Sequence, residues 1–167
     1  MLVAAEFTAG EPFLVLNADN YYPVAALAAL EGLGEPGLSA FGRKALLADG
    51  LIPPERIARF GLLDVGPDGY LRRLIEKPDA ATLRAFGEDP LISMNVWLFF
   101  PGIFRACREI GPSPRGELEI PGAVQHAIDH LGMRFKVLPF RSAVLDLSSR
   151  GDVAAVAERL RGVMVEL

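Results

Sequence analysis

Two apolar segments of this chain each run into an aspartate. Residues 13–19 end in Asp19, and residues 144–146 end in Asp146. Open α/β sheets bind ligands at the carboxyl ends of their strands, so we expect the two carboxylates to meet at one sheet edge. Paired carboxylates suit a hard divalent cation that keeps several waters and bridges phosphate oxygens. The pattern therefore predicts a magnesium site and a phosphorylated substrate.

Both aspartates also have simpler explanations. Asp19 followed by Asn20 is a common turn sequence after a strand. Asp146 could cap a following helix, although the polar residues within 148–152 are better placed to do so. Taken alone, the two aspartates leave these alternatives open.

The elements that position these residues are predicted to alternate irregularly between strands and helices. Hydrophobic residues make up 51% of the 167 residues, which is ample for one core, so we expect a single domain over residues 1–167. Strands are predicted at residues 13–16, 38–41, 61–65, 70–76, 91–100, 134–139 and 143–147. Helices are predicted at residues 2–9, 23–33, 103–109, 118–131 and 152–163. This mixed order favours an α/β core with a β-hairpin excursion at residues 61–76.

Composition and charge exclude several classes of protein. The net charge is −4 and the basic residues form no run, which argues against a nucleic-acid partner. Cys107 is the only cysteine, so it has no partner for a disulfide within the chain. No apolar run reaches the roughly 20 residues that a membrane span needs. We therefore expect a cytoplasmic protein with no membrane partner.

Five short segments together match a known family. In chain order they are residues 14–19 (LVLNAD), 59–61 (RFG) leading into 76–78 (EKP), 93–99 (SMNVWLF), 115–120 (RGELEI) and 145–146 (LD). With them the chain resembles the sugar-1-phosphate nucleotidyltransferases, which include glucose-1-phosphate thymidylyl- and uridylyltransferases. The resemblance covers essentially the whole chain. It implies a nucleotide-diphospho-sugar transferase fold, which is an α/β, Rossmann-like fold with a mixed sheet and a β-hairpin insertion.

The resemblance also implies roles for the charged residues. Asp19 and Asp146 would hold the catalytic Mg²⁺, and Lys77 would meet the sugar phosphate, so these three are the expected catalytic residues. Glu76 would bind sugar hydroxyls. Glu76-Lys77 could instead be a solvated hairpin end, but its position before Pro78 at the end of a strand favours a site.

Three further residues are expected in the sugar pocket. The backbone at Gly61 would lie against the sugar, where a missing side chain permits close approach. Asn95 and Glu117 would line the same pocket. Asn95 stands where many members of the family have glycine, so the resemblance does not identify the sugar.

The reaction that the resemblance implies is transfer of a nucleoside monophosphate. A sugar 1-phosphate would attack the α-phosphorus of a nucleoside triphosphate and release pyrophosphate, and catalysis would consist mainly of positioning and charge neutralisation. Two alternatives stay open. One is a nucleotide-sugar-dependent glycosyltransferase, with Asn17-Ala18-Asp19 in place of a D-x-D motif. The other is a non-catalytic module that binds sugar phosphates.

The family's N-terminal G-x-G-T-R segment, which holds the nucleotide, has no counterpart in these 167 residues. We therefore expect a truncated frame, a fragment or one part of a split protein. The chain alone is expected not to complete nucleotidyl transfer, because triphosphate binding needs backbone N–H donors from such a loop. It is also expected to self-associate through an unpaired sheet edge.

Overall fold

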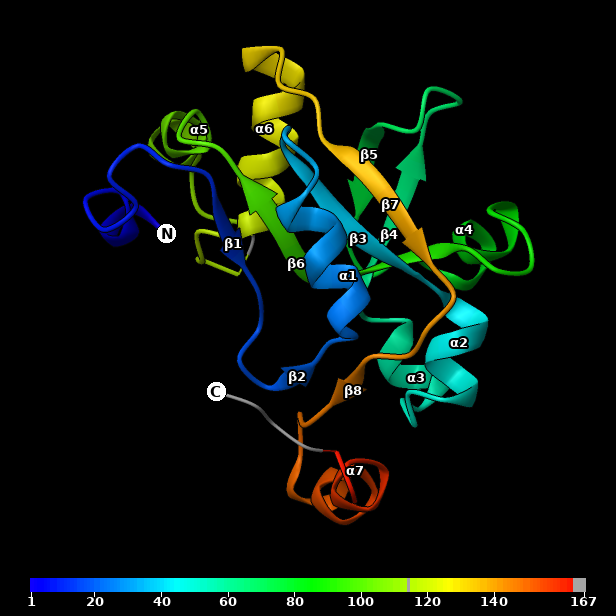
Figure 1. Cartoon of the computed structure of the whole chain (residues 1–167). Coiled ribbons are helices and arrows are strands. Elements are labelled where there is room, and N and C mark those ends of the chain that lie inside the picture. Colours follow the sequence, from blue (N-terminus) through cyan, green and yellow to red (C-terminus); the bar gives the residue numbers. More distant parts are fainter. Residues whose placement is uncertain (114, 164–167) are drawn as a thin grey trace.

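A computed structural model describes residues 1–113 and 115–163 (Figure 1). Its strands are β1 (Phe13–Val15), β2 (Asn20–Tyr21), β3 (Gly37–Gly42), β4 (Gly61–Val65), β5 (Leu71–Ile75), β6 (Leu91–Phe99), β7 (Lys136–Phe140) and β8 (Leu145–Asp146). Its α-helices are α1 (Val24–Glu31), α2 (Arg43–Ala48), α3 (Pro54–Ile57), α4 (Ala80–Ala85), α5 (Ile103–Glu109), α6 (Ile120–Leu131) and α7 (Val153–Arg159). Two 3-10 turns, η1 (Leu2–Ala4) and η2 (Arg150–Asp152), complete the described elements.

Six strands form one mixed sheet around β6. The path across it is β5-β4-β6-β3-β7, with β1 added at β6. Only β3 and β7 run parallel, and the other pairs are antiparallel. One edge of β6 carries two strands in succession, β4 at residues 92–93 and β1 at residues 97–99. The two remaining strands, β2 and β8, form a separate antiparallel pair, which we call the β2–β8 ribbon.

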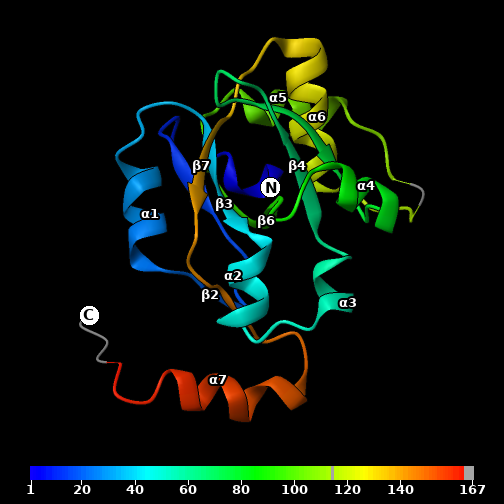
Figure 2. The same ribbon diagram turned by 90° about the vertical axis from the view of Figure 1, so that its right-hand side faces the viewer.

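Helices cover both faces of the sheet. Figure 2 shows α1 on one side and α5 with α6 on the other. The side chains of β6 alternate between the two faces, as the period of a strand requires. Its even positions from Ile92 to Leu98 join the core under α1, and Trp97 and Phe99 join the core under α5 and α6. Each face of the sheet therefore has its own hydrophobic core.

The fold class and most predicted elements are confirmed. The β4–β5 hairpin, β6 and the helices α1, α5 and α6 lie where the residue pattern places them. Three short helices, α2, α3 and α4, were not predicted. One of them, α4, begins at a local signal, because Asp79 accepts a hydrogen bond from the Thr82 N–H at 2.7 Å.

Two predicted elements differ in kind from the structure. The expected helix over residues 2–9 is only the 3-10 turn η1 followed by turns. The strand at residues 13–16 is less buried than its apolar side chains suggest, since Leu14 and Leu16 are exposed at 36% and 43%. In the part of the chain that the structure describes, none of the helices has the length and apolar character to span a membrane.

Candidate functional site

The β2–β8 ribbon brings the two predicted metal ligands together. Asn20 pairs with Asp146 across the ribbon, and the Leu147 N–H donates to the Asp19 carbonyl at 2.9 Å. The two aspartates were expected to end two strands at one edge of one sheet, and this expectation was wrong. Asp19 lies in the turn that leads into β2, and Asp146 lies within β8. Short backbone pairing between distant segments, rather than the edge of the main sheet, places them side by side.

Asn20 adds an oxygen to this pair of carboxylates. Residues directly opposite in an antiparallel pair have their side chains on the same face, with Cβ atoms about 5 Å apart. The Asn20 amide therefore neighbours the Asp146 carboxylate. Its Oδ1 is buried, and no residue within 1–113 or 115–163 donates a hydrogen bond to it. A buried acceptor without a donor costs free energy unless a ligand satisfies it.

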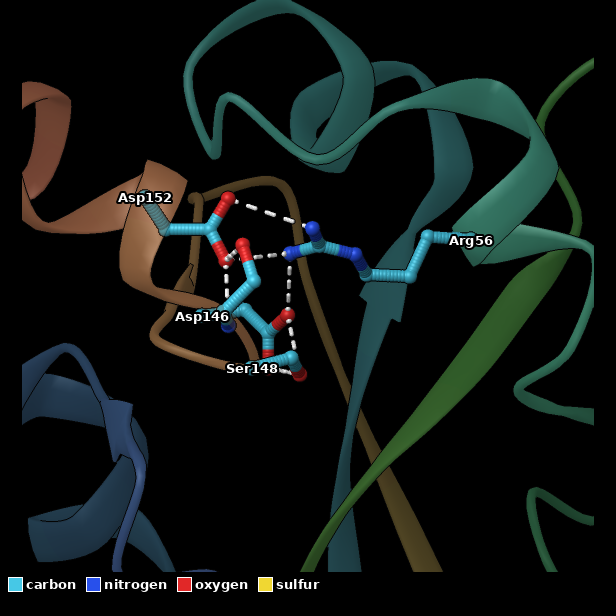
Figure 3. Close-up of polar contacts among 5 residues, drawn as sticks. Arg56, Asp146, Ser148 and Asp152 are labelled. Atoms are coloured by element: carbon cyan, nitrogen blue, oxygen red, sulfur yellow. Dashed lines mark hydrogen bonds and ion pairs between the residues drawn. The ribbon is translucent and has the colours of Figure 1, made fainter.

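Asp146 is held by an arginine and a serine (Figure 3). Arg56 Nη1 donates to Asp146 Oδ2 at 2.7 Å, and the Ser148 hydroxyl donates to the same carboxylate at 2.7 and 2.9 Å to its two oxygens. Arg56 also contacts Asp152 through both Nη atoms, each at 3.1 Å. The Asp146 side chain is consequently only 4% exposed. The aspartate is thus a structural partner of α3 as well as a candidate ligand.

The donor set of this ribbon fits a hard divalent cation. Two carboxylates and an amide oxygen are ligands that Mg²⁺ accepts, and Mg²⁺ usually keeps the other positions for water and phosphate oxygens. Within the described residues, no group of three or more histidine, cysteine, aspartate or glutamate side chains is placed to enclose a metal. A cation held by so few protein ligands would complete its coordination with water and other oxygen ligands, as Mg²⁺ usually does.

Two of the residues predicted for the sugar pocket, Glu76 and Asn95, line a pocket of about 260 Å³. Asn17, Glu76 and Asn95 contribute to it from three separate segments, together with residues at the start of α6. Gly61 lies beside Glu76, since a Cβ there would come within 3.3 Å of Glu76 Oε1 and 2.8 Å of Leu74 Cδ2. Partial burial, reinforced by the negative charge of Glu119, raises the pKa of the Glu76 carboxyl. Any side chain at position 61 would press on this glutamate.

The position of Asn95 follows from an interruption in the sheet. Residues 94–96 fall between the stretches of β6 that pair with β4 and with β1, and the register with β3 also shifts there. Asn95 adopts a left-handed backbone conformation with φ 54°. Asparagine tolerates this region better than most residues, and glycine tolerates it best. This backbone conformation is one that asparagine can adopt at position 95.

Besides Gly61, two residues predicted to bind the sugar phosphate lie outside this pocket lining. Lys77 directly follows Glu76 and is exposed, with φ 46°. Glu117 lines a different hollow, of about 350 Å³, between α5 and α6, whereas Glu119 and Arg115 line the pocket of Glu76. Arg115 and Glu119 also form an ion pair with each other.

Tyr22 links the two parts of the site, and the sequence pattern gave no reason to select it. Its hydroxyl donates to the Met94 carbonyl at 2.6 Å and accepts from the Asn17 N–H at 3.3 Å and from Asn20 Nδ2 at 3.1 Å. Burial raises the pKa of this hydroxyl, and its contact with Asn20 acts in the opposite direction. Because Asn20 Nδ2 is held by the Tyr22 hydroxyl, the Oδ1 of the same amide points away from Tyr22.

Tyr22→Phe is expected to lower the free energy of unfolding by about 1 to 3 kcal/mol, because three buried or half-buried polar groups lose their common partner. Urea denaturation measures the change. Tyr21→Phe is the matched control, since Tyr21 is 40% exposed and should change stability by less than about 0.5 kcal/mol. Equal effects of the two variants would show that the Tyr22 hydroxyl does not hold these segments.

The chain is similar to curated proteins of known activity. A curated low-salt glycan biosynthesis nucleotidyltransferase from Haloferax volcanii is 30% identical over 126 residues, covering 75% of this chain and 32% of the relative. A glucose-1-phosphate thymidylyltransferase from Streptomyces griseus is 30% identical over 132 residues, covering 77% of this chain and 33% of the relative. The chain thus spans about a third of the length of these two relatives.

Solved structures show the same fold at low identity. A structure described as a glucose-1-phosphate thymidylyltransferase from Bacillus anthracis matches with a TM-score of 0.71 at 15% identity, covering 99% of this chain and 61% of that one. A UDP-glucose pyrophosphorylase complexed with UDP-glucose matches with a TM-score of 0.67 at 16% identity, covering 96% and 60%. Residues 1–142 match the family described as nucleotidyl transferase. The chain therefore belongs to the nucleotidyl transferase family.

Proposed function

We propose that this protein acts in the transfer of a nucleoside monophosphate from a nucleoside triphosphate to a sugar 1-phosphate. An oxygen of the sugar phosphate forms a bond to the α-phosphorus, and the bond to the leaving pyrophosphate breaks. The observation that carries the proposal is the β2–β8 ribbon, which joins Asp19 and Asp146 across 126 intervening residues. Family membership favours this reaction over the glycosyltransferase alternative.

Asp19, Asn20 and Asp146 are the residues proposed to hold Mg²⁺. When bound, the cation would neutralise charge on the phosphate oxygens of the nucleotide and the sugar phosphate. The exposed Asp19 is open to a ligand from solvent, whereas Asp146 is covered by Arg56 and Ser148. The protein's own contribution is to fix two carboxylates and one amide oxygen beside the place where the phosphates meet.

The pocket of Glu76 and Asn95 is the proposed sugar site. Glu76 offers a carboxylate to sugar hydroxyls, and the Asn95 amide offers both a donor and an acceptor. Gly61 leaves the space against which a sugar ring can lie. Glu117, which lines the neighbouring hollow, remains a weaker candidate than Glu119, which lines the pocket itself.

Lys77 is the residue proposed to meet the sugar phosphate. Its ammonium group is a compact positive charge on a flexible stem next to the Glu76 pocket, which suits the dianionic phosphate of the sugar before it attacks. The proposal treats residues 1–167 as belonging to one domain and the reaction as cytoplasmic, with a nucleoside triphosphate, a sugar 1-phosphate and Mg²⁺ as its small-molecule partners.

Lys77→Ala is expected to weaken binding of glucose 1-phosphate by about tenfold, because a charge-assisted hydrogen bond is lost. The variant keeps a Cβ at φ 46°, so the backbone strain is unchanged and stability should move by less than about 0.5 kcal/mol. Isothermal titration calorimetry with glucose 1-phosphate measures the affinity. Lys44→Ala, which removes an exposed lysine paired with Glu88, is the control. Unchanged affinity in Lys77→Ala would remove the phosphate role of this lysine.

The reaction itself is tested by following pyrophosphate release with several nucleoside triphosphates and sugar 1-phosphates, with and without Mg²⁺. The chain is assayed beside a fusion that carries the glycine-rich segment of a relative. Magnesium-dependent release by either protein, with a nucleoside diphosphate sugar as product, supports the proposal. Binding of sugar phosphate without release by either protein would favour the non-catalytic alternative.

A further inference from the structure

The guanidinium of Arg56 lies between two carboxylates, one of which is a proposed cation ligand. Figure 3 shows it between Asp146 and Asp152. Its Nη1 reaches both, at 2.7 Å from Asp146 Oδ2 and 3.1 Å from Asp152 Oδ2, and its Nη2 contacts Asp152 Oδ1 at 3.1 Å. Arg56 therefore has one contact with Asp146 and two with Asp152.

The contact with Asp146 lies where a cation would have to bind. Arg56 and Ser148 leave the Asp146 side chain only 4% exposed, so a metal ion cannot reach this carboxylate from solvent while both contacts remain. The serine is a neutral donor that follows Asp146 closely in the chain. The arginine is a positive charge, and it competes with a cation electrostatically as well as sterically.

Asp152 is a partner that Arg56 can keep after it has left Asp146. The Nη2 contact to Asp152 does not involve Asp146, so it can persist when Nη1 leaves Asp146. Asp152 is itself held by the Ser149 N–H at 2.8 Å and the Ser149 hydroxyl at 2.9 Å. These contacts, with that to Arg56 the largest, lower the pKa of the Asp152 carboxyl, so it is ionised at neutral pH.

The charges of the group match a divalent cation. Asp19, Asp146 and Asp152 are three negative groups and Arg56 is one positive group, so the formal charge of the site is two negative units. Removing Arg56 adds one negative unit, and neutralising Asp152 removes one. If Arg56 competes with the cation, the cation affinity should rise as the site becomes more negative and fall as it becomes less negative. If Arg56 only stabilises the site, the affinity should not follow the charge in this way.

We propose that Arg56 and the cation compete for the Asp146 carboxylate, and that Asp152 keeps Arg56 paired when the cation takes its place. Arg56 is then an internal counter-ion that sets the cation affinity, and Asp152 is a positioning residue that acts through it. The proposal rests on the function proposed above, since it takes Asp146 as a cation ligand.

The first test is Mn²⁺ binding, followed by electron paramagnetic resonance, in four proteins. Arg56→Gln should bind Mn²⁺ on the order of tenfold more tightly than the wild-type protein, and Asp152→Asn on the order of tenfold more weakly. The double variant restores the original charge and should bind within a few-fold of wild type. Thermal unfolding of all four proteins verifies that each is folded at the temperature of the titration.

The second test observes the arginine directly. Mg²⁺ should shift the guanidinium ¹⁵N resonances of Arg56, identified by their absence in Arg56→Gln, as Nη1 leaves Asp146. A purely structural role for Arg56 predicts weaker Mn²⁺ binding in both single variants and no Mg²⁺-dependent shift, which would overturn the competition. No Mn²⁺ binding by the wild-type protein would instead remove the cation site of the proposed function, and this inference with it.

Discussion

Asp19→Ala is expected to weaken Mn²⁺ binding by about a hundredfold, because even the outer partners of metal ligands are worth 10 to 100-fold in affinity and Asp19 is proposed as a direct ligand. Asp19 is exposed, so its side chain has little part in packing, and the free energy of unfolding should change by less than about 0.5 kcal/mol. Electron paramagnetic resonance measures the binding, and urea denaturation measures the stability.

Asp129→Ala is the control for this variant, because Asp129 is also an exposed aspartate but lies on α6, outside the β2–β8 ribbon. Its Mn²⁺ affinity should equal that of the wild-type protein. If Asp19→Ala and Asp129→Ala bind Mn²⁺ equally well, Asp19 is not a ligand, and the simpler explanation of Asp19-Asn20 as a turn is correct.

Trp97→Ala is expected to lower the free energy of unfolding by about 3 to 5 kcal/mol, which is the usual cost of truncating a buried aromatic residue. Trp97 is 0% exposed, stacks on Phe99 with ring centroids 5.6 Å apart, and meets Phe135 edge-on at 6.2 Å. It also lies where β6 pairs with both β1 and β3. Urea denaturation followed by circular dichroism measures the loss.

Trp97→Phe separates the contribution of the aromatic ring to stability from that of the indole N–H. Trp97 Nε1 is buried, and no acceptor for it lies within residues 1–113 or 115–163. Phenylalanine removes this N–H while keeping an aromatic ring, so we expect a loss of less than about 1.5 kcal/mol. A loss in Trp97→Phe as large as that in Trp97→Ala would show that the indole N–H has a partner that stabilises the fold.

Most elements of this fold were predictable because their signals are local. Pro23 and Gly32 bound α1, and the turn at residues 66–69 separates β4 from β5. Such signals act over a few residues, so they can be recognised without knowing how the rest of the chain folds. The alternating side chains of β6 are also a local pattern, although two cores rather than one receive them.

The family motifs identified the residues of the candidate site but not how they are held. The strand β2 is two residues long, too short for any periodic pattern, and β8 is only two residues of the strand predicted at 143–147. The two segments pair with each other although they are distant in the chain. Asp19 and Asp146 were expected at one edge of a sheet, and this ribbon is what joins them instead.

The residues missed by sequence reasoning share one physical property. Tyr22 meets Met94 across 72 positions of the chain, and Arg56 meets Asp146 and Asp152 across 90 and 96 positions. A tyrosine in a helix-leading segment and an arginine in a short helix carry no signal of their own partners. The sequence alone identified the motif residues of the family and most of the longer strands and helices, but not the short elements α2, α3, α4 and β2. Only the tertiary structure decided which carboxylate is open to a cation and which is occupied by an arginine, because burial and charge pairing arise when distant segments pack together.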